Sequence, residues 1–234
     1  MRSHASDLNS IFGLDFFDMA RPDTNGLHQL YCNAMTEITL RQKVIADILK
    51  REIRMGIRPS YEMCHLEMRM ICELIAISCL AAHGDIPATR SGRLTSAYEA
   101  DWILRALGEV HPDFYPFPVK MTKKGSENAL CDNNDPYLTK ADVISTYHKC
   151  GAVLHRGNIK TMGPLQTEDK EMRAIWPWLK KSQNLINQHT IILSKPGELV
   201  WVTVEDHRAH MNLLRSLEPK HSPPKSLGSA RLDK

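Results

Sequence analysis

The sequence predicts a mainly α-helical fold: a bundle of four to five helices with a short β-hairpin near the C-terminus. Apolar residues recur at helical spacing over several long segments, and the clearest strand signal is a pair of short β-branched runs late in the chain. The 234 residues are 42% hydrophobic and 24% charged, values typical of a globular protein that buries a full core. We therefore expect one helical domain.

The chain divides into a central domain and two terminal segments. Residues 1–26 mix glycine, proline and polar residues with a small aromatic cluster, so we expect an N-terminal arm that docks onto the body. Residues 27–217 are expected to form the helical bundle domain, with the hairpin at about 190–204. Residues 218–234 have the composition of a disordered tail. The aromatic cluster of the arm consists of Phe12, Phe16 and Phe17.

Five helices are expected, separated by glycine and proline. The second is apolar around nearly its whole circumference, which predicts that it is the central helix of the bundle. Thr139 followed by Asp142 forms an acidic variant of the capping box and predicts the start of the fourth helix. Pro177 lies within the fifth helix and is expected to kink it. The expected helices are residues 27–55, 61–83, 94–110, 139–154 and 168–188.

The segments between and after these helices predict a loop, a hairpin and a short last helix. Residues 112–136 are rich in proline and polar residues, a composition typical of a long surface loop. The β-branched runs at 190–193 and 199–204 are separated by Ser-Lys-Pro-Gly-Glu, which predicts the hairpin. Residues 208–217 are expected to form the last helix.

Composition and charge narrow the classes of function. The net charge is only +3, with acidic residues spread among the basic ones, so the dense basic stripe of a dedicated nucleic-acid binder is missing. Six cysteines without a CxxC pair favour buried free thiols in a reducing compartment. The sequence shows neither a secretory signal nor an apolar run long enough to span a membrane, so we expect a cytoplasmic protein without membrane contact.

Residues 147–158, YHKCGAVLHRGN, have the composition of a functional site at the end of a polar helix. His148 and His155 lie two turns apart on one helix face, and Arg156 follows at the C-terminal end. A histidine beside a cation can act as a general acid or base toward a phosphodiester. The same residues also fit a structural helix end, capped by Arg156 and Gly157 with His155 packed locally.

The stretch from Lys149 to His155 resembles the motif of the HEPN superfamily, helical bundles that include many bacterial ribonucleases and toxin components. That motif places an arginine, a polar residue and, a few positions later, a histidine near the end of a late helix; here Lys149 stands in place of the arginine. The resemblance implies a helical bundle that binds or cleaves RNA. The catalytic residues that it implies are His155, Arg156, Lys149 and His148.

Two further groups are candidate sites. Trp176 and Trp178 flank Pro177 and precede two lysines, a pattern suited to stacking on a base or anchoring a partner, although one core and one half-exposed tryptophan also fits. His207 and His210 are three residues apart beside acidic residues, a spacing that binds a metal if the segment is helical and otherwise fits a surface turn. No Walker loop, GxGxxG, GxSxG, HExxH or EF-hand pattern occurs, and we expect neither cofactor nor metal ion.

Two hypotheses about function follow. The first is an interaction or regulatory module without catalytic activity of its own, which contacts a protein partner through its aromatic arm, proline-rich loop and hairpin and also self-associates. The second is a HEPN-like RNA-binding protein or ribonuclease, whose partner is RNA. We favour the first hypothesis.

Overall fold

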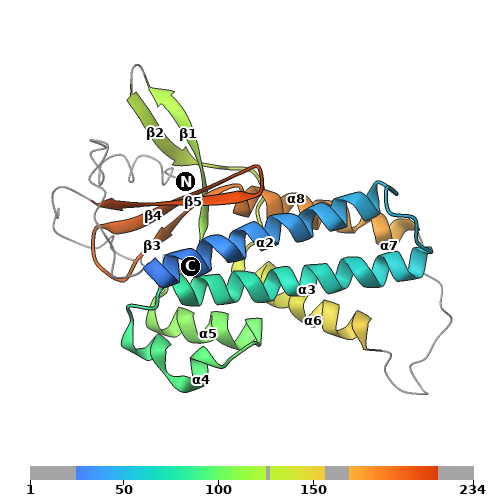
Figure 1. The fold of residues 1–234 in the computed structure, drawn as a ribbon, viewed down its shortest axis with the longest axis horizontal. Helices are drawn as coiled ribbons and strands as arrows, with labels where there is room; N and C mark the ends of the chain where they lie inside the picture. The colour runs from blue at the N-terminus through green and yellow to red at the C-terminus, as the bar shows by residue number, and fades with distance from the viewer. Residues whose placement is uncertain (1–24, 125–126, 156–168, 216–234) are drawn as a thin grey trace, which may run out of the picture.

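The computed structural model describes residues 25–124, 127–155 and 169–215. In these residues, helices pack along and beneath a five-stranded antiparallel sheet of order β2-β1-β3-β4-β5 (Figure 1). The fold is therefore a mixture of helices and sheet. The expectation of a mainly α bundle with only a short C-terminal hairpin is wrong. The predicted tail and almost all of the predicted arm lie outside the described residues.

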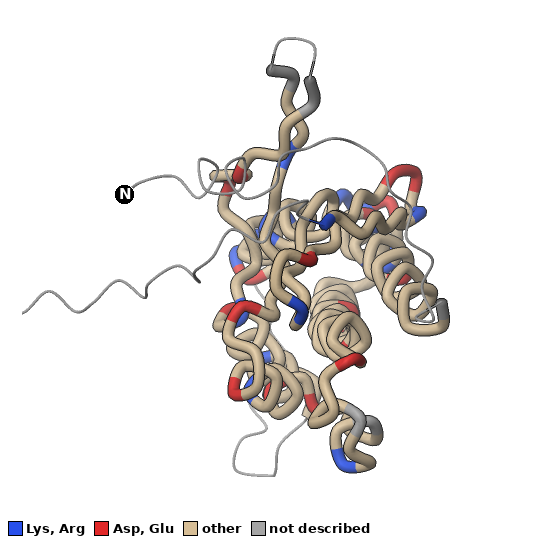
Figure 2. The backbone as a smooth tube through the Cα atoms, turned by 90° about the vertical axis from the view of Figure 1, so that its left-hand side faces the viewer, with Lys and Arg blue, Asp and Glu red and all other residues tan. Residues whose placement is uncertain are grey.

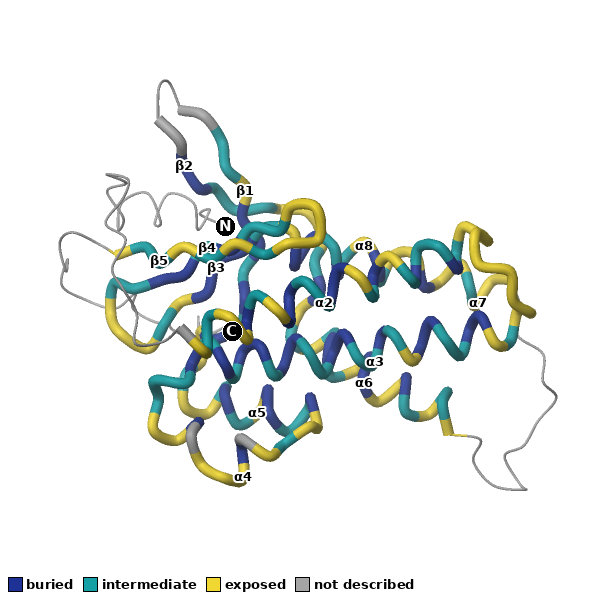
Figure 3. The backbone as a smooth tube through the Cα atoms, in the orientation of Figure 1, coloured by how far each residue is buried: buried dark blue, intermediate teal, exposed yellow. Residues whose placement is uncertain are grey.

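The central helix is α3 (Ile57–Ala82), as the sequence predicts. It packs between α2 (Asn25–Leu49) on one side and both α5 (Ala100–Val110) and α6 (Lys140–Leu154) on the other (Figure 1). Buried positions recur along its length (Figure 3), because its apolar residues cover most of its circumference. Its fully buried side chains include Ile71, Cys72, Ile75 and Cys79.

Two of the expected helices are each divided in two. The chain expected to be helical at 94–110 breaks between α4 (Gly92–Thr95) and α5, where the Ser96 hydroxyl donates to the carbonyl of Gly92 and ends α4. The helix expected at 168–188 breaks at Ala174, between α7 (Asp169–Arg173) and α8 (Ile175–Ile186). Pro177 explains this break, since it has no N–H to donate to the preceding turn. A short 3-10 helix, Pro87–Arg90, precedes α4.

The predicted hairpin is confirmed, and it is part of a larger sheet. Strands β3 and β4 pair antiparallel with Ile191 opposite Val200, and both side chains are fully buried. Strand β1 pairs with β3 only through Phe117 and Pro118, so the β1–β2 hairpin then projects away from the other strands (Figure 1). The strands are β1 (Phe117–Lys124), β2 (Glu127–Asp132), β3 (Gln188–Ile192), β4 (Glu198–Glu205) and β5 (Arg208–Arg215).

Two segments that form strands were expected to be something else. The predicted surface loop at 112–136 contains β1 and β2, where Pro118 is tolerated because it lies at the beginning of a strand. The predicted helix at 208–217 is strand β5, whose exposed and half-buried residues alternate with the period of a strand from Arg208 to Leu213. Its half-buried face packs on α2, which explains the alternation.

Buried hydrogen bonds join the helices to the sheet. The hydroxyl of Tyr31, on α2, donates to Nε2 of His189, on β3, over 2.6 Å, and both residues are fully buried. The other ring nitrogen of His189, Nδ1, donates to the carbonyl of Ile186 over 3.2 Å. The amide of Gln42 likewise donates to the hydroxyl of Ser182 on α8 over 2.8 Å. These contacts fix α2 against the sheet and α8.

Charged residues of both signs are interspersed along the described chain (Figure 2). One cluster joins the two long helices: Arg41 on α2 donates to Glu37 on the same helix and, over 2.8 Å, to Glu67 on α3. Burial alone would lower the pKa of Arg41, but its hydrogen bonds to the two glutamates hold it raised.

The β4–β5 turn provides a test of strand β5, which was not predicted from the sequence. Asp206 and His207 both have positive φ, 48° and 60°, as a two-residue type I′ turn requires. Replacing His207 with glycine should raise the free energy of unfolding by about 0.5–1 kcal/mol, because glycine adopts this conformation without steric strain. Chemical denaturation measures the change. The same replacement at His210, within β5, should instead lower stability; stabilisation at both positions would contradict the assignment.

Stability should fall in acid because of His189. Burial lowers its pKa from 6.5 to about 4, so between these values the unfolded chain binds a proton that the folded chain does not. Its contribution is therefore complete above pH 6.5 and is lost as the pH falls to 4, a loss of roughly 3 kcal/mol. Denaturant titrations from pH 7 to pH 4 measure this loss as the difference between wild type and His189→Gln, because His65 and His83, whose pKa burial also lowers, are present in both. The exposed His210→Gln variant should follow the wild-type curve. An NMR titration that placed the His189 pKa near 6.5 would refute the prediction.

Candidate functional site

The sequence-predicted site lies on α6. Thr139 and Asp142 form the expected capping box, each side chain bonded to the other residue's backbone N–H at 3.1 Å, so the helix begins where predicted. Lys149 is exposed, and His155 is the exposed C-terminal cap of the helix. Arg156 lies outside the described residues. The exposure of His155 therefore contradicts the interpretation in which this side chain packs locally.

His148 is held by a carboxylate from a neighbouring helix. Its Nε2 lies 2.8 Å from Oδ2 of Asp101, on α5, and the other carboxylate oxygen accepts a hydrogen bond from Arg105. Burial raises the pKa of Asp101, but the hydrogen bonds from Arg105 and His148 outweigh that effect and lower it overall. Asp101 is thus a stable anion that can orient the imidazole of His148.

A second polar group, made of Arg69, Glu73 and Tyr147, lies beside the His148–Asp101 pair, between α3 and α6. Arg69 donates to the hydroxyl of Tyr147 over 2.7 Å and to Glu73 over 3.1 Å, and its guanidinium carbon is 4.2 Å from the centroid of the tyrosine ring. Gly151 leaves room for this arginine, since a Cβ there would come within 3.1 Å of Nη1. The arrangement places a hydrogen-bond donor and an oriented imidazole next to each other.

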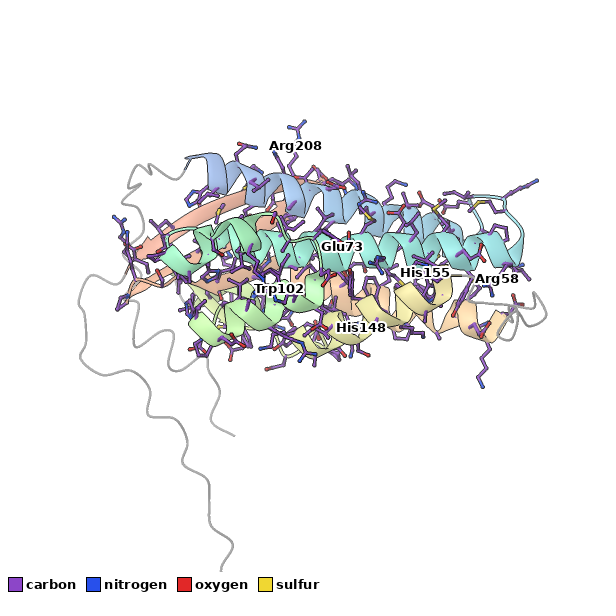
Figure 4. All side chains as sticks on the ribbon, turned by 90° about the horizontal axis from the view of Figure 1, so that it is seen from below. Arg58, Glu73, Trp102, His148, His155 and Arg208 are labelled. Carbon is purple, nitrogen blue, oxygen red and sulfur yellow. The ribbon has the colours of Figure 1, made fainter. Side chains whose placement is uncertain are left out.

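The structure does not bring all the predicted residues into one site. His148 and His155 lie at different points along α6, with His155 toward the same end of the bundle as Arg58 (Figure 4). Two turns of helix separate the two histidines by roughly 10 Å. His148 therefore works with Asp101, on α5, whereas Lys149 and His155 remain exposed outside this pair.

The cysteines and the buried histidine of α3 are unsuited to nucleophilic chemistry. All six cysteines are free, as predicted, and burial raises the pKa of both Cys64 and Cys150 to about 12. His65 is buried, and its Nδ1 donates to the carbonyl of Tyr61 over 3.0 Å. Burial lowers its pKa first of all, and the charges of Lys149 and Arg58 lower it further.

The histidines at 207 and 210 do not form a metal site. The segment is a turn and a strand, so the helical spacing that metal binding would need is absent. Arg208 lies on the opposite side of the molecule from His148 (Figure 4). Across the described residues, no group of three or more histidine, cysteine, aspartate or glutamate side chains is arranged to hold a metal ion.

A cavity of about 640 Å³ lies at the end of the bundle where α2 ends and α3 begins, with α7 and the start of α8 forming the facing wall. Four of its apolar residues are unusually exposed: Ile53 38%, Met55 39%, Ile57 47% and Trp176 39%. We call it the arginine pocket. Its remaining lining residues are Ile48, Leu49, Arg51, Arg54, Ser60, Asp169, Met172 and Arg173.

Local backbone geometry builds this pocket. Arg51 adopts a left-handed φ of 63°, and the N–H of Glu52 bonds back to the carbonyl of Asp47 over 2.9 Å, so α2 ends at Leu49 and not near 55 as expected. The chain from Arg51 to Met55 therefore forms a wall of the pocket. On the other side, the start of α8 presents Trp176.

The two tryptophans differ in exposure, in line with the interpretation of one tryptophan at the core and one at the surface. Trp178 is half-buried against the core, and its Nε1 donates to the hydroxyl of Thr146 over 2.9 Å. Trp176 instead faces the arginine pocket. An exposed tryptophan beside aliphatic side chains is typical of binding surfaces.

The electrostatics of the arginine pocket favour an anionic ligand. Three arginines and one aspartate line it, an excess of two positive charges. Arg51 and Asp169 pair across the mouth at 3.4 Å, but both are largely exposed, so this pair is weak and open to exchange. The N-cap residue of α3, Gly56, has no side chain that could cap the first turn, whose positive end lies at the same place. A ligand that is both apolar and negatively charged would therefore match the apolar side chains and the arginines of the pocket.

The chain was compared with protein-family models, curated proteins and solved structures. Nothing matches. The HEPN resemblance therefore stays a prediction. Within the described ranges, no helix has both the length and the apolar character needed to cross a membrane.

Sequence reasoning missed most of the arginine pocket. Arg51 and Arg54 fell within a segment expected to be helical, and nothing in the sequence marked Arg51 as a residue with positive φ. One signal was present: apolar Ile53, Met55 and Ile57 alternate with charged or glycine residues at the predicted helix end, a pattern that does not fit a helix.

Proposed function

We infer that the protein is a binding module, without catalytic activity of its own, that takes up an acidic, hydrophobic segment of a protein partner in the arginine pocket. One observation carries this inference: three arginines line the same pocket as a group of exposed aliphatic side chains and a tryptophan. The free cysteines support a reducing compartment, and we place the protein in the cytoplasm on that basis.

The composition of the pocket favours a peptide over a nucleic acid. A nucleic-acid site typically combines basic residues with several aromatic platforms. Here one tryptophan stands among isoleucines and methionines, which suit apolar side chains of a partner; methionine adapts well to varied shapes. Arginine is also enriched at the centres of protein interfaces. An extended segment with aromatic or aliphatic residues between carboxylates is therefore the best ligand.

Binding can be measured with a short synthetic peptide in which leucine and phenylalanine alternate with glutamate. We expect it to change the fluorescence of Trp176 and to bind more weakly at high salt, because the charge pairs at an exposed mouth are screened. The Arg54→Glu/Arg173→Glu variant should raise the dissociation constant at least roughly tenfold.

Two controls define the result. The fluorescence change should be lost in Trp176→Phe and kept in Trp201→Phe, since Trp201 lies on β4 and does not line the pocket. A matched peptide with lysine in place of glutamate should bind at least tenfold more weakly. Equal binding of both peptides, or no effect of the arginine substitutions, would refute the proposal.

RNA cleavage is a second candidate function, favoured by the His148–Asp101 pair beside Arg69 and Tyr147. An imidazole oriented by a carboxylate can act as a general base, and an adjacent arginine can stabilise developing charge. Incubation with total RNA tests this candidate: the His148→Ala variant should cleave at least a hundredfold more slowly, and His155→Ala should match wild type. If the pure protein leaves RNA intact, or if His148→Ala cleaves as fast as wild type, this candidate is rejected.

A further inference from the structure

The N-terminal part of this same chain has the composition that the arginine pocket calls for. Residues 11–19 read Ile-Phe-Gly-Leu-Asp-Phe-Phe-Asp-Met: they are apolar except for two aspartates, which flank a pair of phenylalanines, and they include no basic residue. Three of the five phenylalanines in the chain lie here. We propose that residues 11–19 of a second copy occupy the arginine pocket, so that two copies exchange their N-terminal segments. This inference rests on the proposed function.

The pocket and the segment are complementary in composition and in charge. Phe16 and Phe17 lie between Asp15 and Asp18 in the sequence, and the pocket combines apolar residues with arginines contributed by the α2–α3 connection and by α7. An aromatic side chain would cover Trp176 and the neighbouring aliphatic groups, a contact favourable beyond its area alone. Each aspartate would then meet an arginine at the edge, where the pocket carries its positive excess. A volume of about 640 Å³ is in the range that binding pockets have.

Chain length favours a second copy as the source of Phe16 and Phe17. Helix α2 runs from Asn25 to Leu49, and the pocket is lined by Ile48 at its far end. At about 1.5 Å per residue, Asn25 and Ile48 are about 35 Å apart along the helix. Even a fully extended chain spans at most about 3.6 Å per residue, so Phe17 reaches only about 29 Å from Asn25. Phe17 of the same chain falls short, whereas a neighbouring copy has no such limit.

Exchange of segments predicts a dimer that depends on two separate sets of residues. Analytical ultracentrifugation of the 234-residue chain should show a dimer at micromolar concentration. Phe16→Ser/Phe17→Ser should weaken dimerisation by roughly a hundredfold, as expected for loss of two aromatic anchors, and Arg54→Glu/Arg173→Glu should weaken it at least tenfold. Tyr98→Ser removes an exposed aromatic side chain away from the pocket and should leave the dimer unchanged.

Mixing the two double variants separates a lost contact from a misfolded chain. The phenylalanine variant keeps an intact pocket and the arginine variant keeps an intact segment, so an equimolar mixture should form heterodimers through one pocket although neither variant dimerises well alone. Circular dichroism melting curves, recorded at a protein concentration at which wild type is also monomeric, should be the same for both variants and wild type. A mixture that stays monomeric while both variants melt like wild type would overturn the inference.

The Leu/Phe–Glu peptide distinguishes failure of this inference from failure of the proposed function. If the full chain dimerises as proposed, the peptide should compete and dissociate the dimer. If the peptide binds the phenylalanine variant through the arginines but wild type is monomeric, the proposed function stands and the exchange is refuted. If the peptide does not bind that variant, both are refuted. A wild-type dimer that persists in both double variants would also overturn the exchange.

Discussion

Burial of α3 is the constraint on which the rest of the fold depends. A helix with fully buried Ile71 and Ile75 needs partners on most of its surface, and α2, α5 and α6 supply them. Coverage is incomplete at the N-terminal end, where Ile57 and Leu66 remain substantially exposed. The arginine pocket lies at this incompletely covered end of α3. At the other end, the fully buried His83 contacts the carbonyl of Ile192 at 3.1 Å, so the C-terminal end of α3 meets the sheet.

The sequence predicted those parts of the fold that local physics determines. Thr139 and Asp142 form a capping box because both hydrogen bonds lie within one helical turn, and the apolar circumference of α3 follows directly from its composition. The missed elements depend on tertiary contacts. Strand β5 was taken for a helix, although its residues alternate, because its role is visible only once α2 covers one face. The prolines around β1 concealed a hairpin that meets β3 through two residues only.

The candidate sites show the same division. His148 was singled out from its position on a polar helix, but its partner Asp101 lies 47 positions earlier and no local pattern links the two. The predicted partners Lys149 and His155 are exposed and separate from it. For the arginine pocket, Trp176 was recognised as a candidate anchor. Arg51 and Arg54 were not, because their placement follows from where α2 stops, at the left-handed torsion angle of Arg51. Arg173 was not, because it reaches the pocket from α7, far along the chain.

That torsion angle has an energetic consequence for how the pocket is maintained. A left-handed φ at a residue with a side chain is less stable by about 1–2 kcal/mol than the right-handed form, a strain that glycine would avoid. Arg51 is therefore a residue for which folding stability and surface chemistry have opposite requirements. Selection for stability alone would favour glycine here. Such opposition is typical of positions where activity limits stability. Natural variants of this fold that differ at the end of α2 should therefore differ both in affinity and in melting temperature.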